Sequence, residues 1–281
     1  MNAIRLRGVS KSFDGRTVFS GIDLDVATGQ FVSIIGPSGS GKSTLLRIMA
    51  GLEPATAGTV EVSGRPAAHA RVSKQVAMVP QQPGLLPWRT VEANARLLVD
   101  VNRRANGASS AGTTAGRGTA VRDLLHEVGL GDALRLYPHQ LSGGMQQRVA
   151  LVRALALGAP LLMLDEPFAA LDEITRADMR DLLNRLVEQR CTAADGAGPV
   201  TTVLVTHSVG EAVALSDRVL VVSARPARIV SDIAIALPRP RHEDLDDDPA
   251  FIALCRTVRH ALRVGSAGAQ PGGAQPGGVS E

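Results

Sequence analysis

The chain has 281 residues, of which 44% are hydrophobic and 20% are charged, and this ordinary globular composition excludes disorder over its whole length. Its 30 basic and 27 acidic residues leave a formal net charge of +3, which permits contact with phosphates or a membrane surface but requires neither. Aromatic residues make up 2% of the chain, too few for a surface that stacks the bases of single-stranded nucleic acid.

The sequence also argues against membrane insertion and export. Charged residues interrupt every stretch long enough for a transmembrane helix, and the N-terminus lacks the apolar run of a signal peptide. The cysteines, Cys191 and Cys255, have the spacing of neither a disulfide framework nor a metal site. We therefore expect a soluble, unexported chain in a reducing compartment.

The N-terminal part of the chain predicts short strands, then a buried strand and a helix. Residues 4–7 and 22–26 alternate between apolar and polar side chains, and Asp14-Gly15 between them is a typical hairpin turn. Residues 31–35 are nearly all apolar, which is typical of a strand buried on both faces. A glycine-rich turn and an apolar-faced helix follow this strand.

The rest of the core predicts more strands that alternate with helices. Buried strands are expected at 77–79, 161–164 and 202–206, and helices at 174–188 and 210–215. This alternation favours an α/β domain with a mainly parallel sheet, preceded by the antiparallel N-terminal strands.

Residues 88–158 have a different pattern, which predicts an inserted α-helical subdomain. Helical periodicity covers 91–101, 121–128 and 144–157, with no convincing strand between them. Within this region, residues 103–120 are rich in Gly, Ala, Ser and Thr and predict a mobile surface loop; residues 192–199 predict a smaller one. Residues 265–281 repeat Ala-Gln-Pro-Gly-Gly and predict a disordered tail after a domain that spans 1–264.

A phosphate-binding loop lies between the strand at 31–35 and the next helix. The segment Gly36-Pro37-Ser38-Gly39-Ser40-Gly41-Lys42-Ser43, followed by Thr44, matches the pattern G-x4-G-K-[ST]. Glycines let successive backbone N–H groups point at phosphate oxygens, and the helix N-terminus adds its dipole. Lys42 is expected to reach the β- and γ-phosphates, and the Ser43 hydroxyl to bind Mg2+. An ordinary glycine-rich turn is the alternative, but chance supplies only ~0.01 such matches in a chain of this length.

Polar residues follow three of the predicted strands. Asp165 and Glu166 come after 161–164, where we expect Asp165 to hold the metal and Glu166 to act as general base. His207 follows 202–206, as a γ-phosphate sensor or as a structural histidine. Gln81 follows 77–79, where its amide can contact the metal or the attacking water.

One further segment resembles a known family. The segment Leu141-Ser142-Gly143-Gly144-Met145-Gln146-Gln147-Arg148 resembles the signature motif of ATP-binding-cassette (ABC) ATPases. The other motifs stand in the order of that family, with Phe13 at the position that stacks on adenine and Ala170-Leu171-Asp172 at the D-loop. The resemblance implies catalytic roles for Glu166, His207, Gln81 and Lys42. It implies nucleotide contacts from Phe13, residues 36–44, Ser142, Gly143 and Gly144, and a Mg2+ site at Ser43, Gln81 and Asp165.

The resemblance also implies partners. Two cassettes of this family form a head-to-tail dimer in which the signature of one meets the nucleotide on the other. It implies integral membrane permease subunits, an indirectly coupled periplasmic or lipid-anchored solute-binding protein, no nucleic acid, and a peripheral location at the cytoplasmic face of the cell membrane. Two positions depart from the usual pattern, since Pro80 precedes Gln81 where an aromatic is common and Ala169-Ala170 replaces Ser-Ala.

Several segments are similar to those of nitrate, sulfonate and taurine importers, which predicts ATP-driven uptake of such an anion. They are residues 85–91, 171–176, 223–226 and 237–241. Importers of thiamine precursors share much of this pattern, and a soluble ABC ATPase with a non-membrane partner is a second alternative. A small-molecule P-loop kinase is a third, but it leaves the signature segment unexplained. Trp88 is either a core or hairpin anchor or a contact residue beneath the coupling helix of a permease.

Overall fold

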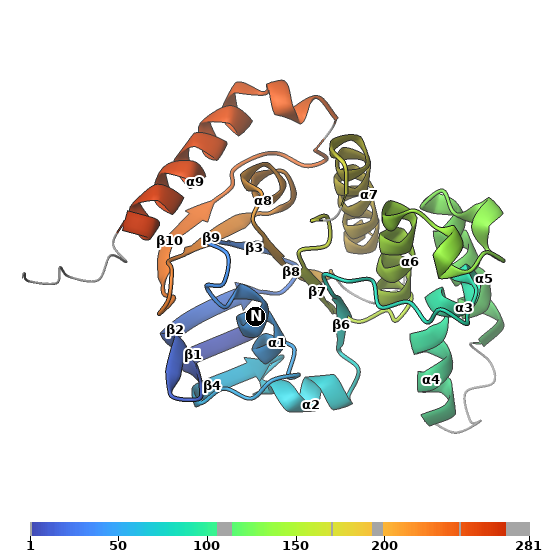
Figure 1. Ribbon diagram of the computed structural model, residues 1–281, viewed down its shortest axis with the longest axis horizontal. Coiled ribbons are helices and arrows are strands. Elements are labelled where there is room, and N and C mark those ends of the chain that lie inside the picture. Colours follow the sequence, from blue (N-terminus) through green and yellow to red (C-terminus); the bar gives the residue numbers. More distant parts are fainter. Residues whose placement is uncertain (1, 106–113, 170, 193–198, 242, 268–281) are drawn as a thin grey trace, which may run out of the picture.

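The strand that precedes the phosphate-binding loop lies inside the larger of two β-sheets (Figure 1). The computed structural model describes residues 2–105, 114–169, 171–192, 199–241 and 243–267. Within these residues a four-stranded sheet has the order β2-β1-β4-β5, and a six-stranded sheet has the order β10-β9-β3-β8-β7-β6. The predicted α/β fold with an antiparallel N-terminal part is therefore confirmed.

The smaller sheet forms from the alternating strands of the N-terminal part. Its strands are β1 (Asn2–Phe13), β2 (Arg16–Ala27), β4 (Ala57–Val62) and β5 (Arg65–Pro66), and all of its pairings are antiparallel. The predicted turn joins β1 to β2, where both Asp14 and Gly15 have positive φ angles, of 48° and 75°. Apolar side chains on one face, such as Ile4 and Leu6, are fully buried.

The larger sheet contains the strands that carry the site. They are β3 (Phe31–Ile35), β6 (Val76–Val79), β7 (Leu161–Asp165), β8 (Thr201–Thr206), β9 (Arg218–Val222) and β10 (Ile229–Ala234). All pairings except that of β10 with β9 are parallel, so the carboxyl ends of β3, β8, β7 and β6 lie along one edge. Every residue of β3, β7 and β8 is buried, which explains why the central residues of these strands are mostly apolar.

Helices cover both faces of the larger sheet (Figure 1). They are α1 (Lys42–Met49), α6 (Gly143–Leu155), α7 (Glu173–Thr192), α8 (Val209–Leu215) and α9 (Pro249–Ala267). Helix α2 (Ala67–Val72) lies instead against β4 and β5 of the smaller sheet. One apolar cluster joins α1 and the smaller sheet to the larger sheet, and a second joins its other face to α6 and α7. The phosphate-binding loop lies where β3 passes from the sheet into α1.

The inserted helical part contains α3 (Val91–Ala95), α4 (Leu97–Ala105), α5 (Thr114–Glu127) and α6, with 3-10 turns at Gly131–Ala133 and Pro138–Gln140. The loop predicted at 103–120 is wrong at both ends, because α4 continues to Ala105 and α5 begins at Thr114. A composition rich in Gly and Thr lowers helix propensity, but the apolar positions of α5 at Val121 and Leu125 are buried in the cluster under α6. Residues 106–113 of that loop lie outside the described residues.

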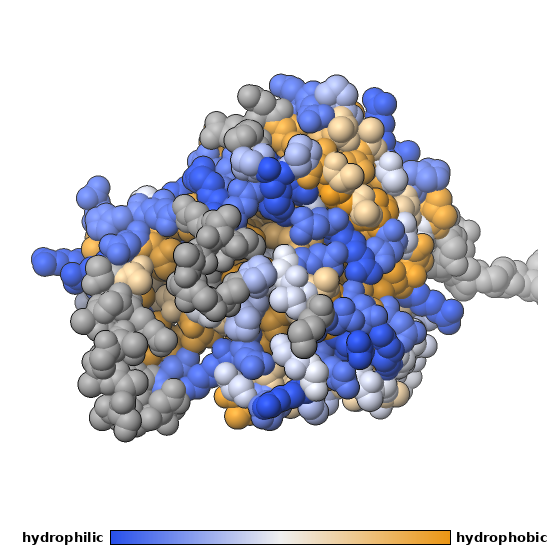
Figure 2. Space-filling view, turned by 180° about the vertical axis from the view of Figure 1, so that it is seen from behind, coloured by the Kyte–Doolittle hydropathy of each residue, from blue (hydrophilic) through white to orange (hydrophobic). Residues whose placement is uncertain are grey.

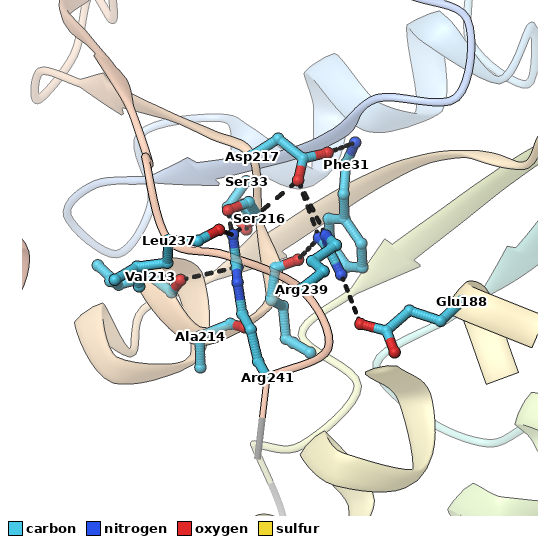
Figure 3. A network of polar contacts seen from close by, with 11 residues as sticks. Phe31, Ser33, Glu188, Val213, Ala214, Ser216, Asp217, Leu237, Arg239 and Arg241 are labelled. Carbon is cyan, nitrogen blue, oxygen red and sulfur yellow. Dashed lines mark hydrogen bonds and ion pairs between the residues drawn. The ribbon is translucent and has the colours of Figure 1, made fainter. Parts of the chain in front are cut away.

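The C-terminal segment ties α8 to the larger sheet (Figure 3). The Arg241 guanidinium donates to the carbonyl oxygens of Val213, Ala214 and Ser216 at 3.1, 2.9 and 2.9 Å, where α8 ends. Burial lowers the pKa of Arg241 to about 10. Arg239 donates to Asp217 at 3.0 Å, and the Asp217 carboxylate accepts from the first amide of β3. These contacts hold the carboxyl end of α8 in place.

The end of the described chain differs from the predicted boundary at residue 264. Helix α9 continues to Ala267, and Gly265 lies so close to β10 that an added Cβ would be 2.8 Å from Val230 Cγ2. The rest of the predicted tail, 268–281, and most of the loop predicted at 192–199 lie outside the described residues. No helix in the described ranges is both long and apolar enough to cross a membrane. Figure 2 shows hydrophilic residues on every side of the rear face, with hydrophobic residues in separate areas between them.

Candidate active site

The phosphate-binding loop is closely packed between two strands. A Cβ added to Gly36 would lie 2.5 Å from Val222 Cγ2 in β9, and one added to Gly41 would lie 2.3 Å from Val18 Cγ1 in β2. Gly41 also has a φ angle of 95°, in the left-handed region that favours glycine. It is the N-cap of α1 and provides no side-chain acceptor for the first helical amides. These amides and the helix dipole therefore form a site for an anion.

Two polar side chains of the loop are buried within it. The Lys42 ammonium donates to the carbonyl oxygens of Gly36 and Pro37, each at 2.9 Å. Burial lowers the pKa of Lys42, and the negative charges of Glu166 and Asp165 oppose that shift. The hydroxyl of Ser40 is buried and has no hydrogen-bond partner among the described residues. A charged amine and an unsatisfied hydroxyl fit a loop built around phosphate oxygens.

Ser43 and Asp165 form an oxygen pair beside the loop. The Ser43 hydroxyl donates to Asp165 Oδ1 at 2.6 Å, and Asp165 ends the buried strand β7. No group of three or more His, Cys, Asp or Glu side chains in the described part of the chain is placed to hold a metal ion. A hydroxyl and one carboxylate instead match the way Mg2+ binds where phosphate and water supply the other oxygens.

Glu166 is the point where the ends of three parallel strands meet. Its carboxylate accepts a 3.0 Å hydrogen bond from the Gln81 amide after β6, and the same oxygen lies 3.6 Å from His207 Nδ1 after β8. The backbone of Glu166 has a φ angle of 45°, which is strained for a residue with a side chain, and its N–H donates to Val205 O at 2.8 Å. The structure thus brings together Gln81, Glu166 and His207, which the sequence placed on separate strands.

The signature segment lies elsewhere in the chain. Ser142 is the N-cap of α6, where its hydroxyl accepts from the Met145 N–H at 3.2 Å. Gly143 is exposed and Gly144 is buried. In Figure 1, α6 and α1 lie on opposite sides of β6 and β7, so one chain does not bring this segment to its own phosphate-binding loop.

Phe13 and Trp88 are both exposed. Phe13 ends β1 with 46% of its surface accessible, and the Lys11 ammonium lies 4.6 Å from its ring centroid. The ring is therefore accessible for stacking on a planar ligand. Trp88 is 71% exposed, so the interpretation of this residue as a core anchor is wrong.

Two buried residues that the sequence analysis missed hold the segment around Trp88. The Asn94 side chain is fully buried and makes four hydrogen bonds, one from Leu86 N–H and three to the carbonyl oxygens of Leu86, Arg89 and Thr90. Arg153, in the helix that begins at the signature, donates to Gly84 O at 2.9 Å and to Pro83 O at 2.6 Å. No local motif marks either residue. Asn94 binds backbone groups of its own neighbourhood, whereas Arg153 acts on a segment that only folding brings near it.

Comparison with known proteins agrees with this arrangement. A family model described as ABC transporter matches residues 19–169. The aliphatic sulfonates import ATP-binding protein of Agrobacterium fabrum (strain C58 / ATCC 33970) is 44% identical over 264 residues, covering 92% of this chain and 83% of that protein. A protein of the same description from Xanthomonas axonopodis pv. citri (strain 306) is 43% identical over 262 residues, covering 93% and 95%.

Solved structures show the same fold. The ATP-binding cassette MJ0796, solved as a dimer in a post-hydrolysis state bound to ADP and Pi, matches with a TM-score of 0.68 at 29% identity. The match covers 84% of this chain and 100% of that chain. A second dimeric structure of MJ0796, described as a bacterial ABC transporter cassette, matches with a TM-score of 0.69 at 30% identity.

Proposed function

The chain belongs to the ABC transporter family of ATP-binding cassettes, and on this premise we propose that it is the ATP-hydrolysing subunit of an importer for small sulfonates. The observation that carries the assignment is the meeting of Gln81, Glu166 and His207 at the strand edge beside the loop that holds Lys42. Hydrolysis of a phosphoanhydride needs a phosphate cradle, a base near the attacking water and groups that stabilise the transferred phosphoryl. Each of these has a residue here.

The roles of the chain's own residues follow from their positions. The amides of the loop 36–44 and the Lys42 ammonium bind the phosphates, and Phe13 stacks on the adenine. Ser43, Asp165 and Gln81 would hold Mg2+, which when bound offsets charge on the phosphate oxygens. Glu166 accepts the proton of the attacking water, and Gln81 orients its carboxylate through the 3.0 Å hydrogen bond. His207 lies beside the same oxygen, where it can contact the γ-phosphate.

The site is proposed to be completed by a second copy of the chain. Ser142, Gly143 and Gly144 present a serine-capped helix start that does not face the loop of the same chain. A helix start binds anions, so the partner's nucleotide is its natural ligand. The dimeric cassettes to which this chain is similar support that arrangement.

The membrane partner is proposed to bind around Trp88. Trp88 is 71% exposed, and its segment is held by four hydrogen bonds, of which the Asn94 side chain donates three and accepts one. An exposed tryptophan on a well-held segment is typical of a protein contact. We assign this surface to a permease subunit at the cytoplasmic face of the membrane. The solute-binding protein would then act through the permease without touching this chain.

The assignment of the solute is tested with the complete transporter. The chain, its permease and its solute-binding protein would be purified together, and ATP hydrolysis measured with alkanesulfonates, taurine, nitrate and a pyrimidine precursor. We expect alkanesulfonates to stimulate hydrolysis most, as the names of the similar proteins suggest. Stimulation by the pyrimidine precursor alone would overturn the assignment of the solute. A rate of ATP hydrolysis that is the same with and without permease and solute would overturn the transport function.

A further inference from the structure

We propose that Arg176 is a positioning residue that links the His207 end of one ATP site to the signature segment that serves the other site. The link runs from Glu211, next to the histidine loop, through the Arg176 guanidinium to the D-loop backbone at Leu171. It rests on the proposed dimer with shared sites.

Glu211 is hydrogen-bonded to the two neighbours of His207, Thr206 at the end of β8 and Ser208 after it. Its carboxylate accepts a hydrogen bond from the Thr206 hydroxyl, and that hydroxyl in turn accepts from the Ser208 N–H at 3.0 Å. The Glu211 N–H donates to Ser208 Oγ at 3.3 Å, so both ends of this short turn are held. The residues on both sides of His207 are therefore hydrogen-bonded to Glu211, directly or through one another.

Arg176 contacts this carboxylate from α7. Its Nε lies 3.7 Å from Glu211 Oε1, and its Nη2 donates to Leu171 O at 2.8 Å. The Nε is buried and has no hydrogen-bond partner in the described ranges, so the ion pair is within charge contact but longer than a hydrogen bond. One guanidinium thus bridges two segments, and a small shift of either changes how well the bridge fits.

The residues at and after the D-loop pack against the first turn of α6, the helix that begins at the signature segment of the same chain. A Cβ added to Gly144 would lie 2.7 Å from Thr175 Cγ2 and 3.6 Å from Leu171 Cδ2. Thr175 is held by Asp172, to which it donates from its N–H at 2.9 Å and from its hydroxyl at 2.8 Å. Residues Leu171 and Thr175 therefore pack closely against the first turn of α6.

The consequence concerns communication between sites. In the proposed dimer, His207 serves the nucleotide on its own chain, while Gly144 serves the nucleotide on the partner. A bridge from one to the other makes the state of the first site change the fit of the second. Binding of ATP at the two sites is then cooperative, and the cooperativity depends on both contacts of Arg176.

The test compares two changes at Arg176 in the purified full-length chain. Arg176→Ala removes both contacts, and Arg176→Lys keeps the positive charge near Glu211 but has a single ammonium that cannot also hold Leu171 O. For both variants we expect the Hill coefficient for ATP hydrolysis to fall toward unity and kcat to fall roughly tenfold. The Kd of nucleotide at the phosphate-binding loop, measured on the monomer, should stay within about twofold.

Arg180→Lys is the matched control. Arg180 lies one turn further along α7 and pairs with Asp246 and Asp181, so it touches neither the D-loop nor Glu211 within ion-pair distance. We expect its cooperativity to remain that of the wild type.

The outcomes separate the two proposals. Normal cooperativity in Arg176→Lys would overturn the bridge, because charge alone would then be sufficient. Normal cooperativity in Arg176→Ala would overturn any coupling role for the residue. If the wild type itself hydrolyses ATP without cooperativity and without dimer formation, the shared site proposed above is wrong. Thermal unfolding of each variant shows whether a loss arises from misfolding.

Discussion

The Ser43 hydroxyl donates a 2.6 Å hydrogen bond to Asp165 Oδ1, although 122 positions separate the two residues in the chain. Ser43 lies in the first turn of α1 and Asp165 at the end of β7, and the strand order β3-β8-β7 brings these ends together. The pair places a hard-oxygen site directly beside Lys42. Side chains from distant parts of the chain therefore meet at one edge of the larger sheet.

Lys42→Ala is expected to reduce ATP hydrolysis to background. The change removes the buried positive charge that lies among the loop carbonyls and faces Asp165 and Glu166. Charge-assisted contacts to phosphate are strong, and no other cation of the loop replaces this one. Hydrolysis and circular dichroism measured together would check it, since a folded variant with near-normal turnover would disprove the role.

Glu166→Gln is expected to slow hydrolysis by roughly 10²–10⁴-fold while nucleotide binding survives. Glutamine keeps the shape and can still hydrogen-bond to Gln81, but it cannot take a proton from water. ATP that is bound and not hydrolysed should hold two chains together. Light scattering should show an ATP-dependent dimer for this variant and mostly monomer for the wild type.

Ser142→Arg added to Glu166→Gln is expected to abolish that dimer. It places a long side chain at the exposed start of α6, where the partner's γ-phosphate would bind, and it removes the N-cap hydroxyl. Fluorescent ATP should still bind to each monomer. A Glu166→Gln protein that binds ATP but stays monomeric at every concentration would contradict the shared site.

Trp88→Ala is expected to leave stability and basal hydrolysis unchanged and to weaken binding to the permease. The side chain is 71% exposed, so its removal costs little in the isolated chain. Asn94→Ala should weaken the same binding but also lower the free energy of unfolding by about 1–3 kcal/mol, because it leaves buried backbone groups unpaired. Arg122→Ala, which breaks the exposed ion pair with Glu92, is the control. Normal permease binding by Trp88→Ala would remove this surface from the proposal.

The contribution of Glu211 to the free energy of unfolding is expected to fall as the pH rises above about 4.5, its ordinary pKa. Burial raises its pKa, although the Thr206 hydrogen bond and the charges of Arg176, His207 and Arg180 oppose this. The folded chain then binds the proton of Glu211 more tightly than the unfolded chain does. The stability that Glu211 contributes therefore decreases as the pH rises from its ordinary pKa to its raised pKa. Denaturant unfolding should therefore show Glu211→Gln gaining stability relative to the wild type over this pH range.

Glu92→Gln is expected to show the opposite pH dependence of stability relative to the wild type. The Arg122 hydrogen bond lowers the pKa of Glu92 below its ordinary value of 4.5, so the stability it contributes is present above that pH and lost below it. We expect the difference between Glu92→Gln and the wild type to shrink as the solution is made more acidic. If Glu92→Gln instead gained stability relative to the wild type as the pH rises, the lowered pKa of Glu92 would be wrong.

Deleting residues 268–281 is expected to change neither ATP hydrolysis nor the thermal midpoint. The segment consists mainly of Gly, Pro, Ala and Gln, and its one larger apolar residue, Val279, is too little to offset the entropy of ordering it. The deletion stops short of Gly265, which lies against Val230. A midpoint lower by several degrees would show that the segment binds to the folded domain.

Most of the site could be predicted because its signals are local. The pattern at 36–43 needs glycine where the chain bends against Val18 and Val222, and mostly apolar runs mark strands buried on both faces. A polar residue follows each of these strands, so the sequence alone could predict that Asp165, Glu166 and His207 lie at one edge of the sheet. The helix at 114–120 was missed, because local composition opposed it and burial of Val121 and Leu125 under α6 could not be seen.

Tertiary structure alone decided which of these ends meet and what supports them. Parallel strands can be ordered in many ways, and only the order β3-β8-β7-β6 places Gln81 and His207 on either side of Glu166. Asn94, Arg153, Arg176 and Glu211 belong to no motif. Arg153 and the pair of Arg176 with Glu211 act between segments far apart in the chain, whereas Asn94 binds the backbone of its own neighbourhood. Short-range periodicity records how each element is buried, whereas hydrogen bonds between distant elements depend on the packing of the whole fold.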